Sequence, residues 1–238
     1  MKRLVTAAFI IAVMASVASA VSFPVTGSNL NSYRTTPTAS GLIGNGGWSA
    51  SGVDGGFKVS WNVSFDNSES VWNYSYTFTE INGNSLQKAI SHILLEVSTS
   101  ITSNNYCQIF SDSNTTISAP QTWVPGANGQ STVGLPVSLY AVDLNGIRGN
   151  TYTFESTHAP MWGSFYAKDG NSCGAATYVY NSGIGSYPTG SSGPFTAWIP
   201  VPDTTAGNPG NPIPEPATMA LLGLGLVGLL ARRKFVRA

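Results

Sequence analysis

The sequence predicts an all-β fold, an antiparallel β-sandwich of the jelly-roll type, for the region from residue 21 to residue 202. Three observations lead to this prediction. Apolar and polar residues alternate through two long segments, turn pairs such as Asn82-Gly83 recur between shorter apolar runs, and no long segment has helical periodicity. Short strands at this spacing, without helices between them, are typical of sandwiches and jelly rolls.

The clearest element is a hairpin over residues 57–78. Every second residue on its two strands is apolar: Phe57, Val59, Trp61, Val63 and Phe65 on the first, and Trp72, Tyr74, Tyr76 and Phe78 on the second. Residues 66–70 between them have the composition of a turn. The pattern predicts two antiparallel strands with one buried face and one face in water.

Further strands are expected at seven places along the chain, namely residues 93–97, 106–110, 139–144, 151–155, 162–167, 176–180 and 195–199. The run 93–97 is apolar enough for the centre of a sheet. A short helix is allowed by the composition of residues 85–89. The expected domain is therefore built from strands, and its length of under 200 residues does not require a second domain.

The first 20 residues have the pattern of a secretory signal peptide. Lys2 and Arg3 precede an uncharged apolar run over residues 4–17, and the small residues Ala18 and Ala20 follow it. This order predicts export by a Sec-type machinery and cleavage before Val21.

The last residues form a second targeting pattern. A linker rich in Pro, Gly and Asn over residues 203–213 precedes Pro214, Glu215 and Pro216. The apolar run at 217–231 contains Leu221, Leu222, Leu224, Leu226, Leu229 and Leu230, and the basic residues Arg232, Arg233 and Lys234 end it. As a helix of about 1.5 Å rise per residue it would be roughly 22 Å long, against a hydrocarbon core of about 30 Å. The run predicts a short hydrophobic helix that holds the chain in a membrane, with the basic end in the cytoplasm.

Residues 214–238 resemble the PEP-CTERM sorting signal of exported proteins in Gram-negative bacteria. The resemblance rests on the Pro-Glu-Pro triplet, the Leu- and Gly-rich run and the Arg-Arg-Lys end, in that order. It implies recognition near Pro214–Pro216 by an exosortase, a membrane-embedded enzyme similar to a cysteine transpeptidase, and Glu215 would then be a recognition residue. Proteins of this kind occur in bacteria that make exopolysaccharide and biofilm. An ordinary tail anchor is the alternative.

A second resemblance lies inside the domain. Residues 91–98 and 162–170 are similar to segments that recur in exported proteins with the same tail and no assigned activity. This resemblance supports one β-rich ectodomain and leaves its role open.

Charge and cysteine content restrict the function classes. Outside the signal peptide and the tail, five basic and ten acidic residues remain, so the exported region carries a net charge of −5 and is not expected to bind nucleic acid. Cys107 and Cys173 both lie in this region, and in an oxidising compartment they predict one disulfide. The chain-entropy model assigns such a bridge about 4 kcal/mol.

No catalytic site is predicted. His92 and His158 are expected to be polar side chains near strand edges, since no nucleophile motif accompanies them. Glu80, expected to face solvent, and Glu96, expected to be a partnered core carboxylate, are the best pair for a glycan hydrolase. Residues 66–69 and 143–146 contain oxygen ligands suited to a structural calcium ion, although such segments are also typical of plain turns.

Aromatic residues outside the hairpin suggest a second function class. Trp48, Trp123, Trp162, Trp198 and Tyr187 could stack on the apolar faces of sugars, or they could pack in the core. The sequence therefore predicts a non-enzymatic exported surface or matrix protein without a cofactor, sorted by an exosortase and associated with exopolysaccharide. A surface-displayed carbohydrate-binding module is the alternative, and a glycan-active hydrolase is the third hypothesis.

Overall fold

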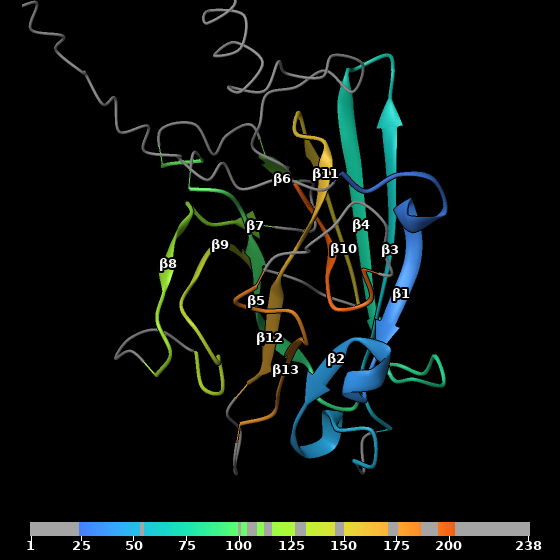
Figure 1. The fold of residues 1–238 in the computed structure, drawn as a ribbon, viewed down its shortest axis with the longest axis vertical. Helices are drawn as coiled ribbons and strands as arrows, with labels where there is room; N and C mark the ends of the chain where they lie inside the picture. Colours follow the sequence, from blue (N-terminus) through green and yellow to red (C-terminus); the bar gives the residue numbers. More distant parts are fainter. Residues whose placement is uncertain are drawn as a thin grey trace, which may run out of the picture.

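The computed structural model describes residues 24–52, 55–99, 101–103, 109–111, 116–126, 132–145, 150–170, 176–186 and 195–202. Within these residues the chain forms antiparallel sheets and three short 3-10 turns, so the all-β prediction is confirmed (Figure 1). The strands are β1 (Asn31–Thr35), β2 (Leu42–Gly44), β3 (Lys58–Asp66), β4 (Val71–Thr79), β5 (Ile90–Glu96), β6 (Ile109–Ser111), β7 (Thr116–Ile117), β8 (Gln121–Trp123), β9 (Leu139–Asn145), β10 (Thr151–Ser156), β11 (Pro160–Gly163), β12 (Phe165–Asp169), β13 (Tyr178–Asn181) and β14 (Ile199–Pro202).

The predicted hairpin forms the centre of a five-stranded sheet with the strand order β1-β3-β4-β10-β6. β3 and β4 pair over their full length, from Lys58 opposite Thr79 to Asp66 opposite Val71. The alternation places the aromatic positions on the inner face, as expected. Phe65 is an exception, because at the end of the hairpin its side chain stays 36% exposed and packs against Trp72.

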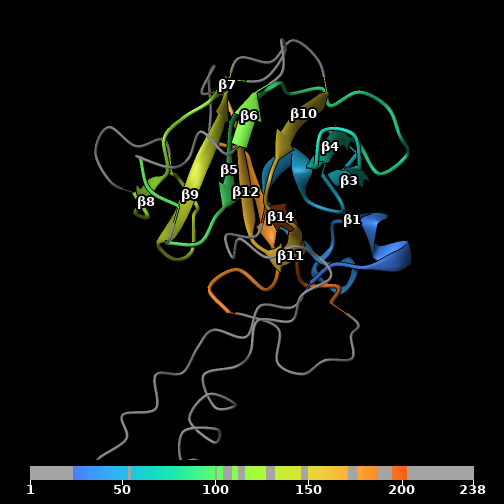
Figure 2. The same ribbon diagram turned by 90° about the horizontal axis from the view of Figure 1, so that it is seen from above.

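The second large sheet has the strand order β2-β13-β12-β5-β9-β7, and β8 also pairs with β9. β5 lies in its interior, where Leu95 is opposite Phe165 on one side and Val142 on the other. The prediction of a central strand near residues 93–97 is therefore confirmed. Figures 1 and 2 show this sheet on one side of the molecule and the β3–β4 hairpin on the other.

The two sheets share one hydrophobic core, which is the packing that a sandwich-like arrangement requires. Inner residues of the five-stranded sheet, such as Tyr76 and Phe78, belong to the same buried cluster as Phe165 and Leu95 of the other sheet. The rings of Phe78 and Phe165 lie 6.4 Å apart across the interface. Aromatic side chains thus supply much of the area that the fold buries.

A buried arginine fastens the last described segment to the sheets. Arg34 points inward from β1, with its guanidinium 4.9 Å from the Trp61 ring and 5.7 Å from the Trp162 ring. It donates hydrogen bonds to the carbonyl oxygens of Tyr33 and Phe195, and burial lowers its pKa to about 10. Cation–π contacts of this kind compensate part of the cost of burying the charge.

Asn181 makes a second link to the same segment. Its side chain is fully buried, accepts a 2.8 Å hydrogen bond from the Phe165 N–H and donates one of 2.8 Å to the Ala197 carbonyl oxygen. One amide therefore satisfies two backbone groups, one on β12 and one in the segment before β14.

Some predicted boundaries were wrong. The run expected at residues 162–167 is two strands, β11 and β12, which separate at Ser164. The strand expected at 195–199 begins only at Ile199 and continues through Pro200 and Pro202, because it pairs with β11 alone, where prolines are tolerated. No helix forms at residues 85–89, a segment too short to stabilise one by itself.

Candidate functional site

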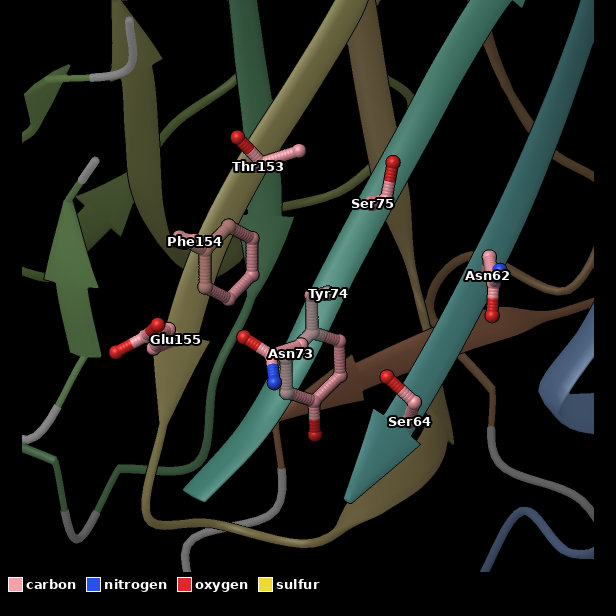
Figure 3. Close-up of a pocket in the computed structure, with 8 residues that line it drawn as sticks. All are labelled: Asn62, Ser64, Asn73, Tyr74, Ser75, Thr153, Phe154 and Glu155. Carbon is pink, nitrogen blue, oxygen red and sulfur yellow. The ribbon is translucent and has the colours of Figure 1, made fainter. Parts of the chain in front are cut away.

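A groove lies on the outer face of the five-stranded sheet (Figure 3). It has a volume of about 290 Å³. Its polar side chains come in pairs from three neighbouring strands: Asn62 and Ser64 from β3, Asn73 and Ser75 from β4, and Thr153 and Glu155 from β10. Tyr74 and Phe154, which lie between them in the strands, complete the lining.

The strand register aligns these side chains in two rows. Ser75 is opposite Asn62 on one side and Thr153 on the other. In the next row, Asn73 is opposite Ser64 and Glu155. Because side chains of a strand alternate between faces, the inward aromatic positions force these polar positions outward.

The chemistry of the groove is that of uncharged polar groups with one carboxylate. Two amides and three hydroxyls supply both donors and acceptors, and Glu155 supplies the single charge. None of these residues is predicted as a site from the sequence. One feature of the sequence could have indicated the groove. The outward positions of the alternating pattern are mostly Ser, Asn and Thr residues rather than charged ones.

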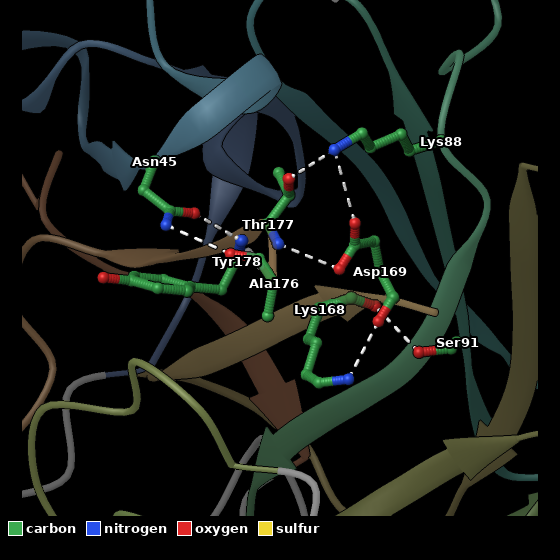
Figure 4. A network of polar contacts seen from close by, with 8 residues as sticks. All are labelled: Asn45, Lys88, Ser91, Lys168, Asp169, Ala176, Thr177 and Tyr178. Carbon is green, nitrogen blue, oxygen red and sulfur yellow. Dashed lines mark hydrogen bonds and ion pairs between the residues drawn. The ribbon is translucent and has the colours of Figure 1, made fainter. Parts of the chain in front are cut away.

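A network of polar contacts lies at the far end of β12 (Figure 4). Asp169 accepts a 2.9 Å hydrogen bond from the Thr177 N–H, and its other carboxylate oxygen lies 3.6 Å from the Lys88 ammonium. The ammonium of Lys168 donates to the Asp169 carbonyl oxygen, and Asn45 bonds the backbone of Tyr178 and Ala176. These contacts join the residues that flank β2, β13 and β5 to the end of β12, so we interpret the network as structural.

His92 and Asp143 form a buried pair on β5 and β9. His92 Nδ1 lies 3.2 Å from an Asp143 carboxylate oxygen, and each side chain is 8% exposed. The imidazole contacts the Trp123 ring edge-on at 4.9 Å. His158 is also buried, in the connection between β10 and β11, so the expectation of a histidine near a strand edge was wrong for His92 alone, which lies within β5.

The two predicted hydrolase carboxylates do not lie in the groove. Glu80 is only 4% exposed and accepts a 3.3 Å hydrogen bond from Gln87, so the prediction that it faces solvent was wrong. Glu96 is half-buried and accepts a 2.6 Å hydrogen bond from the Ser164 N–H, as expected for a partnered carboxylate. Each is engaged by its own neighbour; Glu80 directly follows β4 of the five-stranded sheet, whereas Glu96 ends β5 of the other large sheet.

The indole side chains predicted to stack on sugars are mostly buried. Trp48, Trp123 and Trp162 are 0%, 6% and 1% exposed, so none of the three offers a ring face to solvent, and that prediction was wrong for them. Each packs in a hydrophobic cluster instead. Trp198 is half-buried and donates a hydrogen bond to the Ser186 carbonyl oxygen, and Tyr187 lies outside the described residues.

The two segments considered for calcium behave differently. Asp66 accepts hydrogen bonds from the backbone and hydroxyl of Ser68 and from the Glu69 N–H, which is a plain Asx turn that lowers the Asp66 pKa. Asp143 lies in β9 rather than in a turn, and Gly146 is outside the described residues. In the part of the chain that the structure describes, no three His, Cys, Asp or Glu side chains gather as a metal site.

The remaining predicted sites fall outside the described residues. These are the signal peptide with Ala18, Ala20 and Val21, the cysteines Cys107 and Cys173, and everything from residue 203 onward. Among the described residues, no helix has the length and apolarity needed to cross a membrane.

Comparison with known protein families identifies the C-terminal segment. The chain carries a PEP-CTERM protein-sorting motif. The match covers residues 212–234, which include Pro214–Pro216 and the basic residues Arg232–Lys234. No curated protein and no solved structure matches the chain. The motif indicates an exported protein that an exosortase sorts to the cell envelope.

Proposed function

We propose that this protein is a non-enzymatic component of the bacterial cell surface or extracellular matrix, associated with exopolysaccharide. The single observation that carries the proposal is the sorting motif at residues 212–234. In this view the predicted signal peptide directs Sec-type export, and the apolar tail tethers the chain in the inner membrane. The exosortase then acts near Pro214–Pro216 and releases the β-rich domain to the surface.

The placement of the acidic and histidine side chains supports a role without catalysis. Glycoside hydrolysis generally uses two carboxyl groups about 5–10 Å apart, and the groove lining holds only Glu155. His92 is buried in a pair with Asp143 beneath Trp123, so a substrate in solution has no direct access to it.

Cell fractionation tests the proposal. The protein is followed with an antibody in the host bacterium and in strains that lack either the exosortase or exopolysaccharide synthesis. We expect it in the surface and matrix fractions of the host, in the inner membrane without the exosortase, and in the medium without exopolysaccharide. An identical distribution in all three strains would contradict both the sorting step and the matrix association.

The groove favours a second candidate, a surface-displayed carbohydrate-binding module, because its amides and hydroxyls are open to solvent on a rigid sheet. A third candidate, a glycan-active hydrolase, would need Glu155 as one of its two acids. Release of reducing ends from a polysaccharide by the wild-type chain, lost in Glu155→Gln, would support the hydrolase instead of a binding role.

A further inference from the structure

We propose that the groove on β3, β4 and β10 binds an uncharged polysaccharide, with Asn62 and Asn73 as the principal hydrogen-bonding residues. This inference rests on the proposed function, because it gives a matrix-associated protein its ligand. It assigns the contact to the outer face of the five-stranded sheet, at the residues shown in Figure 3.

The polar groups of the groove are available to a ligand. Among the described residues, none of the six polar side chains of the groove has a hydrogen-bond partner, although Thr77 and Thr151, just beyond it, bond to each other. A primary amide presents two donors and an acceptor side by side. Neighbouring hydroxyls of a sugar ring match that pattern, since each hydroxyl both donates and accepts.

The charge of the groove selects against acidic glycans. Glu155 is its only charged lining residue, and no lysine or arginine lines it. The exported region has a net charge of −5, which repels a polyanion further. An uncharged chain meets no such repulsion, and a carboxylate can accept a hydrogen bond from a sugar hydroxyl.

The sheet itself excludes an added peptide strand as the ligand. β3 pairs with β1 and β4, and β4 pairs with β3 and β10, so the backbone groups of the two strands are already used. Peptides that join a sheet need a free edge. The groove can therefore be recognised only through its side chains, as an extended chain of hydroxyl groups would do.

An exposed aromatic ring lies beside the groove. Tyr33 on β1 is two residues from Asn31, which is opposite Asn62, so it is a diagonal neighbour of Asn62 on the same face. Its side chain is 57% exposed, and the Lys58 ammonium lies 4.7 Å from the ring centroid. Because the ammonium lies over one face of the ring, a sugar that extends beyond Asn62 would stack on the other face.

The test is affinity electrophoresis of the full-length chain, kept soluble in a detergent without a sugar head group. The native gels contain dextran or laminarin as uncharged glucans, or alginate as the polyanion. We expect retardation by at least one glucan and none by alginate. Asn62→Ala/Asn73→Ala should weaken binding roughly tenfold for each amide removed.

A matched control separates loss of binding from loss of folding. Asn29→Ala/Asn67→Ala removes two exposed asparagines outside the groove and should bind as the wild-type chain does. Ser75→Tyr, which fills the middle of the groove from its open side, is the second variant. If the Asn62/Asn73 variant melts at a lower temperature than the control, its loss of binding could come from unfolding, and the Ser75→Tyr variant then tests the groove instead. We expect Ser75→Tyr to abolish retardation.

Three results would overturn the inference: no retardation of the wild-type chain by either glucan, retardation by alginate alone, or glucan binding that both groove variants retain. The fractionation experiment fails or succeeds independently. A chain that reaches the matrix but binds no glucan contradicts only the groove assignment, whereas one that binds glucan but is never sorted contradicts only the proposed function.

Discussion

The hydroxyl of Tyr76 provides a sensitive measure of the packing between the five-stranded sheet and the separate β11–β14 pair. The side chain is 1% exposed, and its O–H donates a 2.7 Å hydrogen bond to the Pro200 carbonyl oxygen of β14. Tyr76→Phe removes this bond and leaves the ring in its stack with Phe154. A hydrogen bond of this kind contributes about 1–2 kcal/mol to the free energy of unfolding. In a domain of this size, the melting temperature should fall by roughly 3–6 °C.

Thermal unfolding followed by circular dichroism measures the effect, with Tyr33→Phe as the matched control. The Tyr33 side chain is 57% exposed, so its variant should stay within about 0.5 kcal/mol of the wild-type chain. Equal melting temperatures for Tyr76→Phe and the wild-type chain would refute the reasoning, because the hydroxyl would then have no role in joining β4 to β14.

Three further predictions concern stability. Asn181→Ala leaves the buried Phe165 N–H without its partner and removes one of the two hydrogen bonds to the Ala197 carbonyl oxygen, which keeps the one from the Gly183 N–H, so urea titration should show a loss of about 1–3 kcal/mol; a loss below about 0.5 kcal/mol would contradict this role of the amide. Gly41→Ala should lower the melting temperature markedly, because φ is +102° and the new Cβ would meet a backbone carbonyl oxygen. Gly83→Ala, at φ +92° in open space, should cost less, and a reversed order would disprove the steric argument. Burial raises the pKa of Tyr152 and Tyr166 in the folded chain, so the stability that depends on their neutral form is complete below about pH 10 and declines above it; a stability that stays constant in urea titrations from about pH 8 to 11 would contradict this.

The parts of the fold with a strong local pattern could be predicted from the sequence. The β3–β4 hairpin follows directly from the alternation, since the period of two fixes which face each residue occupies. The central position of β5 follows from its apolar run. β1 and β14 could not be found in this way, because Asn31–Thr35 is mostly polar and Ile199–Pro202 contains two prolines. Both strands exist through pairing with distant segments.

The candidate site, too, depends on pairing between distant segments that the local pattern does not reveal. The alternation predicts that Asn62 and Asn73 face solvent, but only the register across β3, β4 and β10 brings them into one groove. Burial of His92 also depends on a tertiary contact, with Trp123. A sequence read as separate elements contains no information on these contacts. The sorting motif differs, because it is read as a linear segment and so could be recognised from residues 214–238 alone.

Mass spectrometry of the intact protein from the cell surface tests the central claim most directly. In the host bacterium we predict a product that begins at Val21 and lacks the apolar run and the basic residues after Pro216. In a strain without the exosortase, the product should keep that tail and remain in the membrane. Surface protein from the host that still carries residues 235–238 would contradict the account of sorting and release.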